Sequence, residues 1–160
     1  MKARTVLREQ STIVGLHLIC PFSEMGAEIP NTWDKLKKRL IDLRVHPVPD
    51  KIFGMYPQIS DDPDPERCHY ILGFEVHHPL EVPEDMVRIV LPPLWYASLH
   101  YQGPLESYVN VAYGEVNSFI RQNGYEVNQN EYVLEVKRAS IDLRDQTKAG
   151  QEIELMVPLN

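Results

Sequence analysis

The order of the expected secondary-structure elements is the feature that most constrains this chain, because the same order occurs twice. Residues 12–77 read as a strand, a helix and two further strands, and residues 94–159 read in the same order. The two segments share little direct sequence identity, so the repeat is one of architecture. Two such units predict an α+β fold in which one helix covers each half of the sheet, with a cleft between the halves.

The expected strands are short segments of alternating apolar residues, separated by prolines, glycines and charged loops. They cover residues 12–19, 51–58, 68–77, 86–93, 94–101, 131–137 and 152–159. Residues 1–160 are therefore expected to form one domain, with repeat halves of about 1–80 and 81–160.

Two helices are expected from apolar stripes with a spacing of three and four residues. The first covers residues 31–44, with Asn31 or Thr32 as its N-cap, because the prolines and glycine of residues 20–31 break the pattern before it. The second covers residues 104–122, which begin at a proline and end shortly before a glycine.

Composition limits the classes of function. The chain has 160 residues, 43% hydrophobic and 24% charged, which is typical of a soluble domain with a substantial core. It has no apolar run long enough for a membrane span and no recognisable signal peptide, so a cytoplasmic location without membrane contact is expected. The formal net charge of −7 argues against direct nucleic-acid binding, which needs clustered lysine and arginine.

Neither a structural metal nor a cofactor is expected. Cys20 and Cys68 lie in or beside expected strands, which favours free thiols over a disulfide. His77 and His78 are adjacent on a strand and point to opposite faces, so they are unsuited to sharing a metal ion. The sequence also contains no glycine-rich phosphate-binding loop.

Residues 131–137, EYVLEVK, place a carboxylate in the middle of an expected strand. Strand alternation puts Glu135 and Lys137 on one face, which we expect to line the cleft. The opposite face, together with that of the last strand, is expected to pack beneath the helices: Tyr132, Leu134, Val136, Ile153, Leu155 and Val157. Alternation alone is equally compatible with a Glu135 carboxylate that faces water.

Five segments, in this order, resemble a known family: IFGMYPQISDD, CHYILGFEV, VRIVLPPLWYASLHYQGPLESYVNVAYGEVNSFIRQNGYEV, EYVLEVK and IELMVPL. They are similar to the GyrI-like small-molecule-binding domain, also called the AraC-type effector-binding domain, which senses ligands in several multidrug-responsive transcription regulators. The resemblance covers nearly the whole chain and lies in the order and spacing of the segments. It implies duplicated βαββ units with pseudo-twofold symmetry, antiparallel sheets and a ligand cleft between the halves.

The resemblance also implies a site. Members that bind cationic lipophilic drugs carry a glutamate on the penultimate strand, inside an aromatic pocket, and Glu135 matches that position. Lys137 departs from the family pattern, since it places an amine on the same face about 6.5–7 Å along the strand. The implied ligand-binding residues are Glu135, Trp33, Tyr56, Tyr70, Tyr96, Tyr113 and Lys137, with Tyr108 as the alternative to Tyr113 on the second helix. Core packing is the competing interpretation for each aromatic residue.

Three functions are compatible with these residues. The first is a stand-alone protein that senses or sequesters lipophilic compounds, including cationic ones, without a DNA-binding segment of its own. The second is a hydrolase of electrophilic, cyclopropane-type xenobiotics, with Glu135 as general acid or base. The third is an inhibitor of a partner protein, of the gyrase-inhibitor type.

Overall fold

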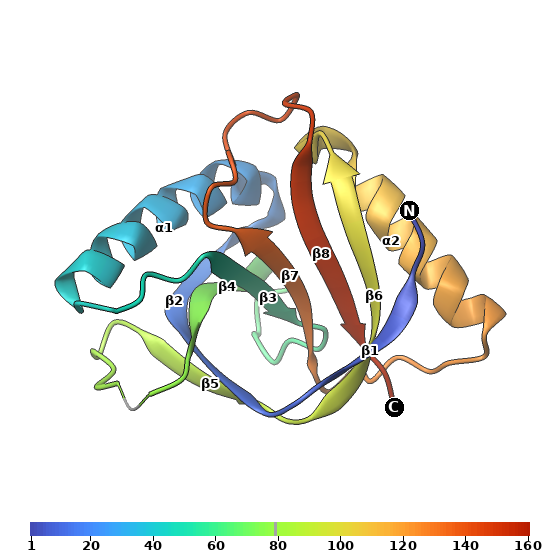
Figure 1. Cartoon of the computed structure of the whole chain (residues 1–160), viewed down its shortest axis with the longest axis horizontal. Helices are drawn as coiled ribbons and strands as arrows, with labels where there is room; N and C mark the ends of the chain where they lie inside the picture. Colours follow the sequence, from blue (N-terminus) through green and yellow to red (C-terminus); the bar gives the residue numbers. More distant parts are fainter. Residues whose placement is uncertain (79) are drawn as a thin grey trace.

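The computed structural model describes residues 1–78 and 80–160, which form one curled antiparallel sheet with two helices (Figure 1). The helices are α1 (Phe22–Asp42) and α2 (Leu105–Gln122). The strands are β1 (Arg4–Arg8), β2 (Ser11–Pro21), β3 (Lys51–Pro57), β4 (Arg67–Val76), β5 (Val87–Leu91), β6 (Leu94–Gly103), β7 (Tyr132–Arg138) and β8 (Gln151–Pro158). The α+β class and the expected order of helices and strands are confirmed.

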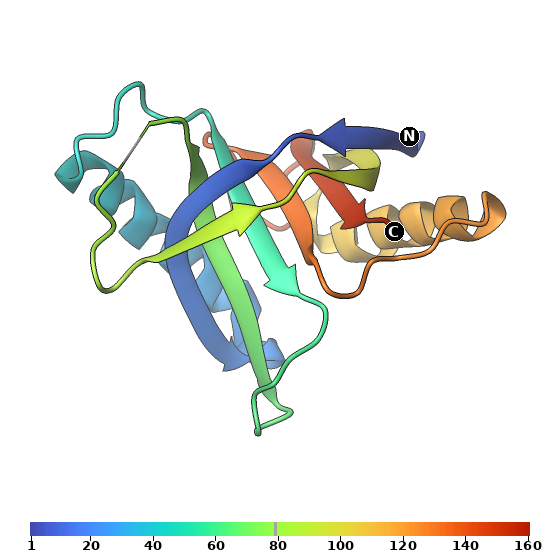
Figure 2. The same cartoon turned by 90° about the horizontal axis from the view of Figure 1, so that it is seen from below.

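The eight strands form a single sheet in the order β1-β6-β8-β7-β3-β4-β2-β5. The order reads the same from either edge if β1 is exchanged with β5, β2 with β6, β3 with β7 and β4 with β8. The two halves meet at the centre, where β3 pairs with β7 from Lys51↔Arg138 to Pro57↔Tyr132. In Figure 2 the halves diverge from this pair and carry α1 and α2 at opposite sides of the molecule.

Three apolar clusters fill the space on the two faces of the sheet. One lies beneath α2 and includes Leu99, Ala112, Val133 and Leu155. A second lies beneath α1 and includes Trp33, Leu36, Tyr70 and Leu72. The third covers the face turned away from the helices and includes Ile13, Phe53, Met55, Tyr96, Leu134, Val136 and Met156.

The expected faces of β7 are reversed in the structure. Leu134 and Val136 belong to the cluster on the face away from the helices, whereas Val133 packs beneath α2. Pairing decides this orientation, because Glu135 lies opposite Leu155 of β8, which is itself beneath α2. The prediction for β8 was right, but Glu135 and Lys137 share the side of the sheet that carries the helices.

Helix α1 begins at Phe22, well before the expected start near residue 31. Pro21 occupies the N-cap, and Pro30 lies inside the helix and is itself buried. Thr32 does not cap the helix but donates a hydrogen bond to the carbonyl oxygen of Glu28, 2.8 Å away. Burial of the early turns against the sheet therefore outweighs the unfavourable intrinsic propensities of proline and glycine.

Strand β1 was not expected from the sequence and forms one edge of the sheet, paired with β6. Within the described residues, neither helix is long and apolar enough to cross a membrane. Cys20 and Cys68 are free thiols, as expected, and they face each other across the β2–β4 pair.

Candidate functional site

The carboxylate of Glu135 lies at the centre of the sheet, between the clusters beneath the two helices. Glu135 as a whole is only 8% exposed to solvent. The neighbouring strands place Gly54 of β3 and Leu155 of β8 directly beside it. A carboxylate this deeply buried needs hydrogen-bond partners, because an unpaired buried charge is costly.

Tyrosine hydroxyls from both halves of the fold supply those partners. Tyr70 of β4 donates a hydrogen bond to Oε1 of Glu135 at 2.9 Å, and Tyr113 of α2 donates one to Oε2 at 3.2 Å. The hydroxyls of Tyr113 and Tyr56 lie 2.7 Å apart. Glu135 is thus held by one helix and two strands, which come from three separate parts of the chain.

Lys137 completes the arrangement from the same face of β7. Its Nζ donates a hydrogen bond to the Tyr70 hydroxyl at 2.9 Å and lies 5.3 Å from the centre of the Tyr70 ring. The Tyr70 hydroxyl therefore accepts from Lys137 and donates to Glu135. A buried amine and a buried carboxylate are joined through one phenol.

Tyr108 of α2 adds a fourth hydroxyl to this tyrosine–glutamate cluster, which we define as Glu135, Lys137, Tyr56, Tyr70, Tyr108 and Tyr113. The Tyr108 ring lies edge-on to Tyr113, with ring centres 6.0 Å apart. Its hydroxyl is buried and has no hydrogen-bond partner among the described residues. A ligand that reached this hydroxyl would satisfy it.

Burial dominates the ionisation of the cluster. It raises the pKa of Tyr56 to about 12, and it raises the pKa of Tyr70 and of Tyr113, with the Glu135 charge adding to the effect on each of these two. The pKa of Lys137 is lowered by burial, and the nearby Glu135 charge opposes this shift. The phenols therefore remain neutral hydrogen-bond donors throughout the physiological pH range.

The structure brings together Glu135, Lys137, Tyr56, Tyr70 and Tyr113 from the expected set of ligand-binding residues. The other two lie elsewhere. Trp33 is buried beneath α1, with Nζ of Lys37 5.3 Å from the centre of its ring, and Tyr96 lies in the cluster on the opposite face of the sheet.

The sequence offered Tyr108 and Tyr113 as alternatives, because five residues along a helix turn a side chain by about 140°. In the structure the two are not alternatives: the Tyr113 hydroxyl donates to Glu135, and the Tyr108 ring packs edge-on against the Tyr113 ring.

The tyrosine–glutamate cluster is closely packed. Cavities of about 440 and 430 Å³ occur among the described residues, but neither is lined by Glu135 or by the four tyrosines. Glu135, Tyr70 and Tyr108 are each at most 8% exposed, so a ligand reaches Glu135 only past the side chains and backbone that cover it.

The connection between β7 and β8, residues 139–150, rises between the helices in Figure 1, and its residues 144–150 are exposed. Arg144 bonds Oδ2 of Asp34 and Oδ1 of Asn31 on α1, each at 2.9 Å. The Gln146 carbonyl oxygen accepts a hydrogen bond from the Glu106 N–H of α2 at 3.0 Å. This segment thereby links the two helices that flank the cluster.

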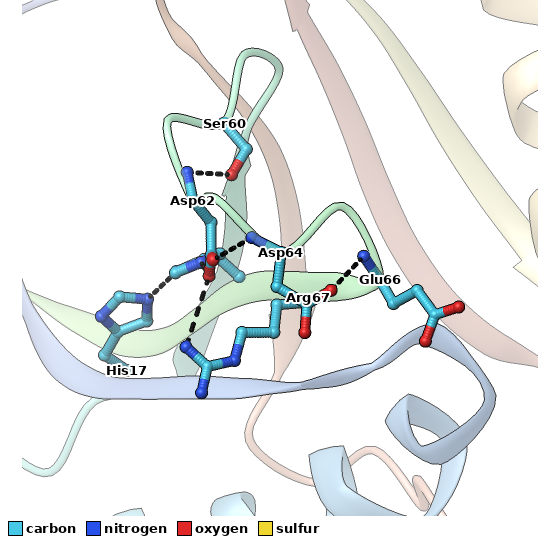
Figure 3. A network of polar contacts seen from close by, with 7 residues as sticks. His17, Ser60, Asp62, Asp64, Glu66 and Arg67 are labelled. Atoms are coloured by element: carbon cyan, nitrogen blue, oxygen red, sulfur yellow. Dashed lines mark hydrogen bonds and ion pairs between the residues drawn. The ribbon is translucent and has the colours of Figure 1, made fainter.

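A second polar network joins the β3–β4 loop to the outer strands (Figure 3). Nε2 of His69 donates a hydrogen bond to Oδ2 of Asp62 at 2.7 Å, and Nε2 of His17 lies 2.9 Å from Nδ1 of His69. Burial, followed by the charge of His69, lowers the pKa of His17. Asp62 also bonds the Asp64 N–H, so this network fixes the loop rather than surrounding a cavity.

Comparison with known proteins agrees with this fold. The sequence profile described as "GyrI-like small molecule binding domain" matches residues 1–157. The transcriptional regulator BrlR of Pseudomonas aeruginosa is 32% identical over 103 residues, which are 64% of this chain and 36% of BrlR. This chain therefore spans only about a third of that regulator.

Solved structures share the fold at low sequence identity. SAV2435 bound to tetraphenylphosphonium matches with a TM-score of 0.69 at 16% identity, over 100% of this chain and 94% of SAV2435. The C-terminal domain of EcmrR matches with a TM-score of 0.71 at 16% identity, over 99% of this chain and 97% of that domain.

Proposed function

This chain belongs to the family of GyrI-like small-molecule-binding domains, and we propose that it binds lipophilic compounds beside Glu135, between its two helices. The observation that carries the proposal is the buried Glu135 carboxylate held by the hydroxyls of Tyr70 and Tyr113. Aromatic rings supply apolar contact area, while the carboxylate and the free Tyr108 hydroxyl supply the polar contacts that orient a ligand.

A lipophilic cation fits the chemistry of this cluster. It would be attracted to Glu135, and each tyrosine face would add about 0.5–2 kcal/mol of cation–π interaction. The structure of SAV2435, which shares the fold, is bound to such a cation, tetraphenylphosphonium.

Lys137 sets a limit on that preference. Its amine is linked to Glu135 through the Tyr70 hydroxyl, so part of the carboxylate charge is already compensated within the protein. A permanent cation must then compete with a resident amine for the same carboxylate. Neutral aromatic compounds with hydrogen-bonding groups are therefore the favoured ligands of this chain.

The site lies where two repeated units meet. In this proposal the chain is one domain of two βαββ units, β2-α1-β3-β4 and β6-α2-β7-β8, which are related by a pseudo-twofold axis and are each preceded by one further strand, β1 or β5. The palindromic strand order supports this, with β3 and β7 as the central pair. Gly54 and Glu135 face each other across that pair, so both units contribute to the ligand site.

A thermal-shift assay tests the proposal with tetraphenylphosphonium and its neutral counterpart triphenylphosphine oxide. Both compounds should raise the melting temperature of the wild-type protein, and Glu135→Gln should lose most of the response to the cation. Glu115→Gln, on the exposed surface of α2, is the matched control and should behave as wild type. If neither compound stabilises the wild-type protein, the proposed ligand class is wrong.

Hydrolysis is a second candidate function, favoured by the pairing of a carboxylate with neutral phenols. Glu135 can take a proton from a water molecule and deliver it to the product carbon, while Tyr113 stabilises a developing anion by donating a hydrogen bond. With a cyclopropane substrate, water would add across one strained carbon–carbon bond, placing hydroxyl on one carbon and hydrogen on the other. Mass spectrometry of an aryl cyclopropyl ketone after incubation should show this addition for wild type and not for Glu135→Gln.

A further inference from the structure

A cavity of about 440 Å³ lies on the face of the sheet turned away from Glu135. Phe53 of β3 and Val136 of β7 line it, and they are only 3% and 7% exposed. The wall includes Arg8 at the end of β1, Glu75 near the end of β4 and Glu154 in β8. Its volume lies within the range of about 300–1,000 Å³ that is usual for small-molecule sites.

Arg8 has unused hydrogen-bonding capacity in this cavity. Its guanidinium lies over Phe53, 5.1 Å from the ring centre, which fixes its position. Its Nε is buried and has no hydrogen-bond partner among the described residues. The carboxylate of Glu75 is 3.6 Å from one terminal nitrogen, which is beyond normal hydrogen-bond distance. A guanidinium offers five N–H donors in a planar fork, the geometry that a carboxylate accepts best.

The formal charges around the cavity balance, with Arg8, Arg44 and Lys51 against Asp50, Glu75 and Glu154, so selection of an anion rests on the unused donors of Arg8. Glu75 is shared between Arg8 and His77, and Glu154 accepts a hydrogen bond from Ser98 at 2.7 Å. Arg44 and Lys51 line the cavity and form no ion pair with any of the described residues. Asp50 is the remaining carboxylate, and it is exposed to solvent, as Arg44 and Lys51 are.

We propose that this cavity binds a small aromatic carboxylate. Its ring would lie against Phe53 and Val136, and its carboxylate would accept hydrogen bonds from Arg8. The Glu135 site is separate. Phe53 precedes Gly54 in β3, Val136 follows Glu135 in β7, and Phe53 and Val136 pair with each other. Adjacent residues of a strand point to opposite faces, so the two sites lie back to back across the central strand pair.

Binding of 2-naphthoate to the full chain tests this proposal by calorimetry, with 2-naphthamide as the neutral ligand of the same shape. The naphthoate should bind wild type at least about tenfold more tightly than the amide, because the charged hydrogen bonds to Arg8 are lost with the amide. Arg8→Gln should weaken naphthoate binding by a similar factor. Arg4→Gln, on the same strand and exposed, should leave it unchanged.

The location of binding is checked by backbone amide chemical shifts in the same titration. Shifts centred on Phe53 and Val136 support the cavity, and shifts centred on Tyr113 and Glu135 overturn it. Equal affinity of naphthoate and amide for wild type also overturns it, even if Arg8→Gln does not fold. Glu135→Gln should still bind naphthoate, so failure of the proposed function and failure of this second site can be told apart.

Discussion

Gly54 lies directly opposite Glu135 in the β3–β7 pair, and the absence of a side chain at Gly54 makes room for the hydroxyl that binds this carboxylate. A Cβ atom at Gly54 would lie 1.8 Å from the Tyr70 hydroxyl oxygen and 3.2 Å from Nζ of Lys137. The link from amine to phenol to carboxylate therefore depends on a glycine at this position.

Replacing Gly54 by alanine should break that link. Tyr70 must move away from the new methyl group, which removes its hydrogen bonds to Glu135 and Lys137 and leaves both charges poorly paired. We expect the free energy of unfolding to fall by about 2–4 kcal/mol, measured by urea denaturation. Gly114→Ala in α2 is the control, since nothing lies within 4 Å of its added Cβ, and it should stabilise the protein by about 0.5–1 kcal/mol. Equal stability of Gly54→Ala and wild type would contradict this account of the site.

Lys137 is the residue expected to govern selectivity between cations and neutral ligands. Lys137→Gln keeps a hydrogen-bond donor near Tyr70 but removes the charge that opposes Glu135. Affinity for tetraphenylphosphonium should rise about tenfold relative to triphenylphosphine oxide, because the carboxylate charge is no longer compensated. Calorimetric titration of both compounds gives this ratio. Lys148→Gln, in an exposed part of the β7–β8 connection, should not change it, and an unchanged ratio in Lys137→Gln would remove the assigned role.

The tyrosines of this cluster and the role of Glu135 were predicted only through the family resemblance, whereas the common face of Glu135 and Lys137 follows from strand alternation, which is a local property. It correctly placed Glu135 and Lys137 on one face of β7. The face that meets the helices could not be derived in this way, because it depends on pairing with β3 and β8, which are distant in the sequence. The same limit applies to Tyr96, whose side of the sheet is opposite to that of Glu135.

Helix α1 shows a second limit. Its first turns contain Gly26 and Pro30, two residues whose intrinsic propensities predict an interruption of the helix. Met25 and Trp33 nevertheless bury against β2 and β4, and that long-range packing determines where the helix begins. Tertiary contacts of this kind leave no local signal in the sequence.

The buried phenols should make the protein less stable in alkali. Tyr56 ionises at about pH 12 in the folded chain but near 10.0 when unfolded, so its contribution is complete below pH 10 and is lost as the pH rises towards 12. Tyr70 and Tyr113 act in the same direction, since the pKa of each is raised. The lowered pKa of Lys137 acts in the opposite direction, but the effect of this one amine is outweighed by the combined effect of several phenols. Urea denaturation between pH 8 and 11 should therefore show decreasing stability above about pH 10, with a smaller decrease in Tyr113→Phe than in the exposed control Tyr125→Phe.

The histidine network should respond to mild acid. The pKa of His17 is lowered in the folded chain from an ordinary value of 6.5, so the unfolded chain takes up this proton first as the pH falls. Its contribution to stability is present above about pH 6.5 and is lost as the pH falls through the folded-state pKa. His17→Gln should flatten the pH dependence of the melting temperature in this window, and the exposed control His100→Gln should not. Identical slopes in His17→Gln and wild type would show that the network is not linked to folding.

The connection between β7 and β8 should control how fast ligands reach Glu135. Arg144 holds it to Asp34 and Asn31 of α1, while Gln146 holds it to the start of α2. Arg144→Ala releases the α1 side alone and leaves every residue of the tyrosine–glutamate cluster in place. Association and dissociation rates of tetraphenylphosphonium, followed by stopped-flow fluorescence, should therefore rise together several-fold, with little change in Kd. Arg121→Ala, an exposed residue near the end of α2, is the matched control and should leave both rates unchanged. If Arg144→Ala changes the Kd but not the rates, Arg144 contributes to the bound state rather than to access, and the segment does not act as a gate.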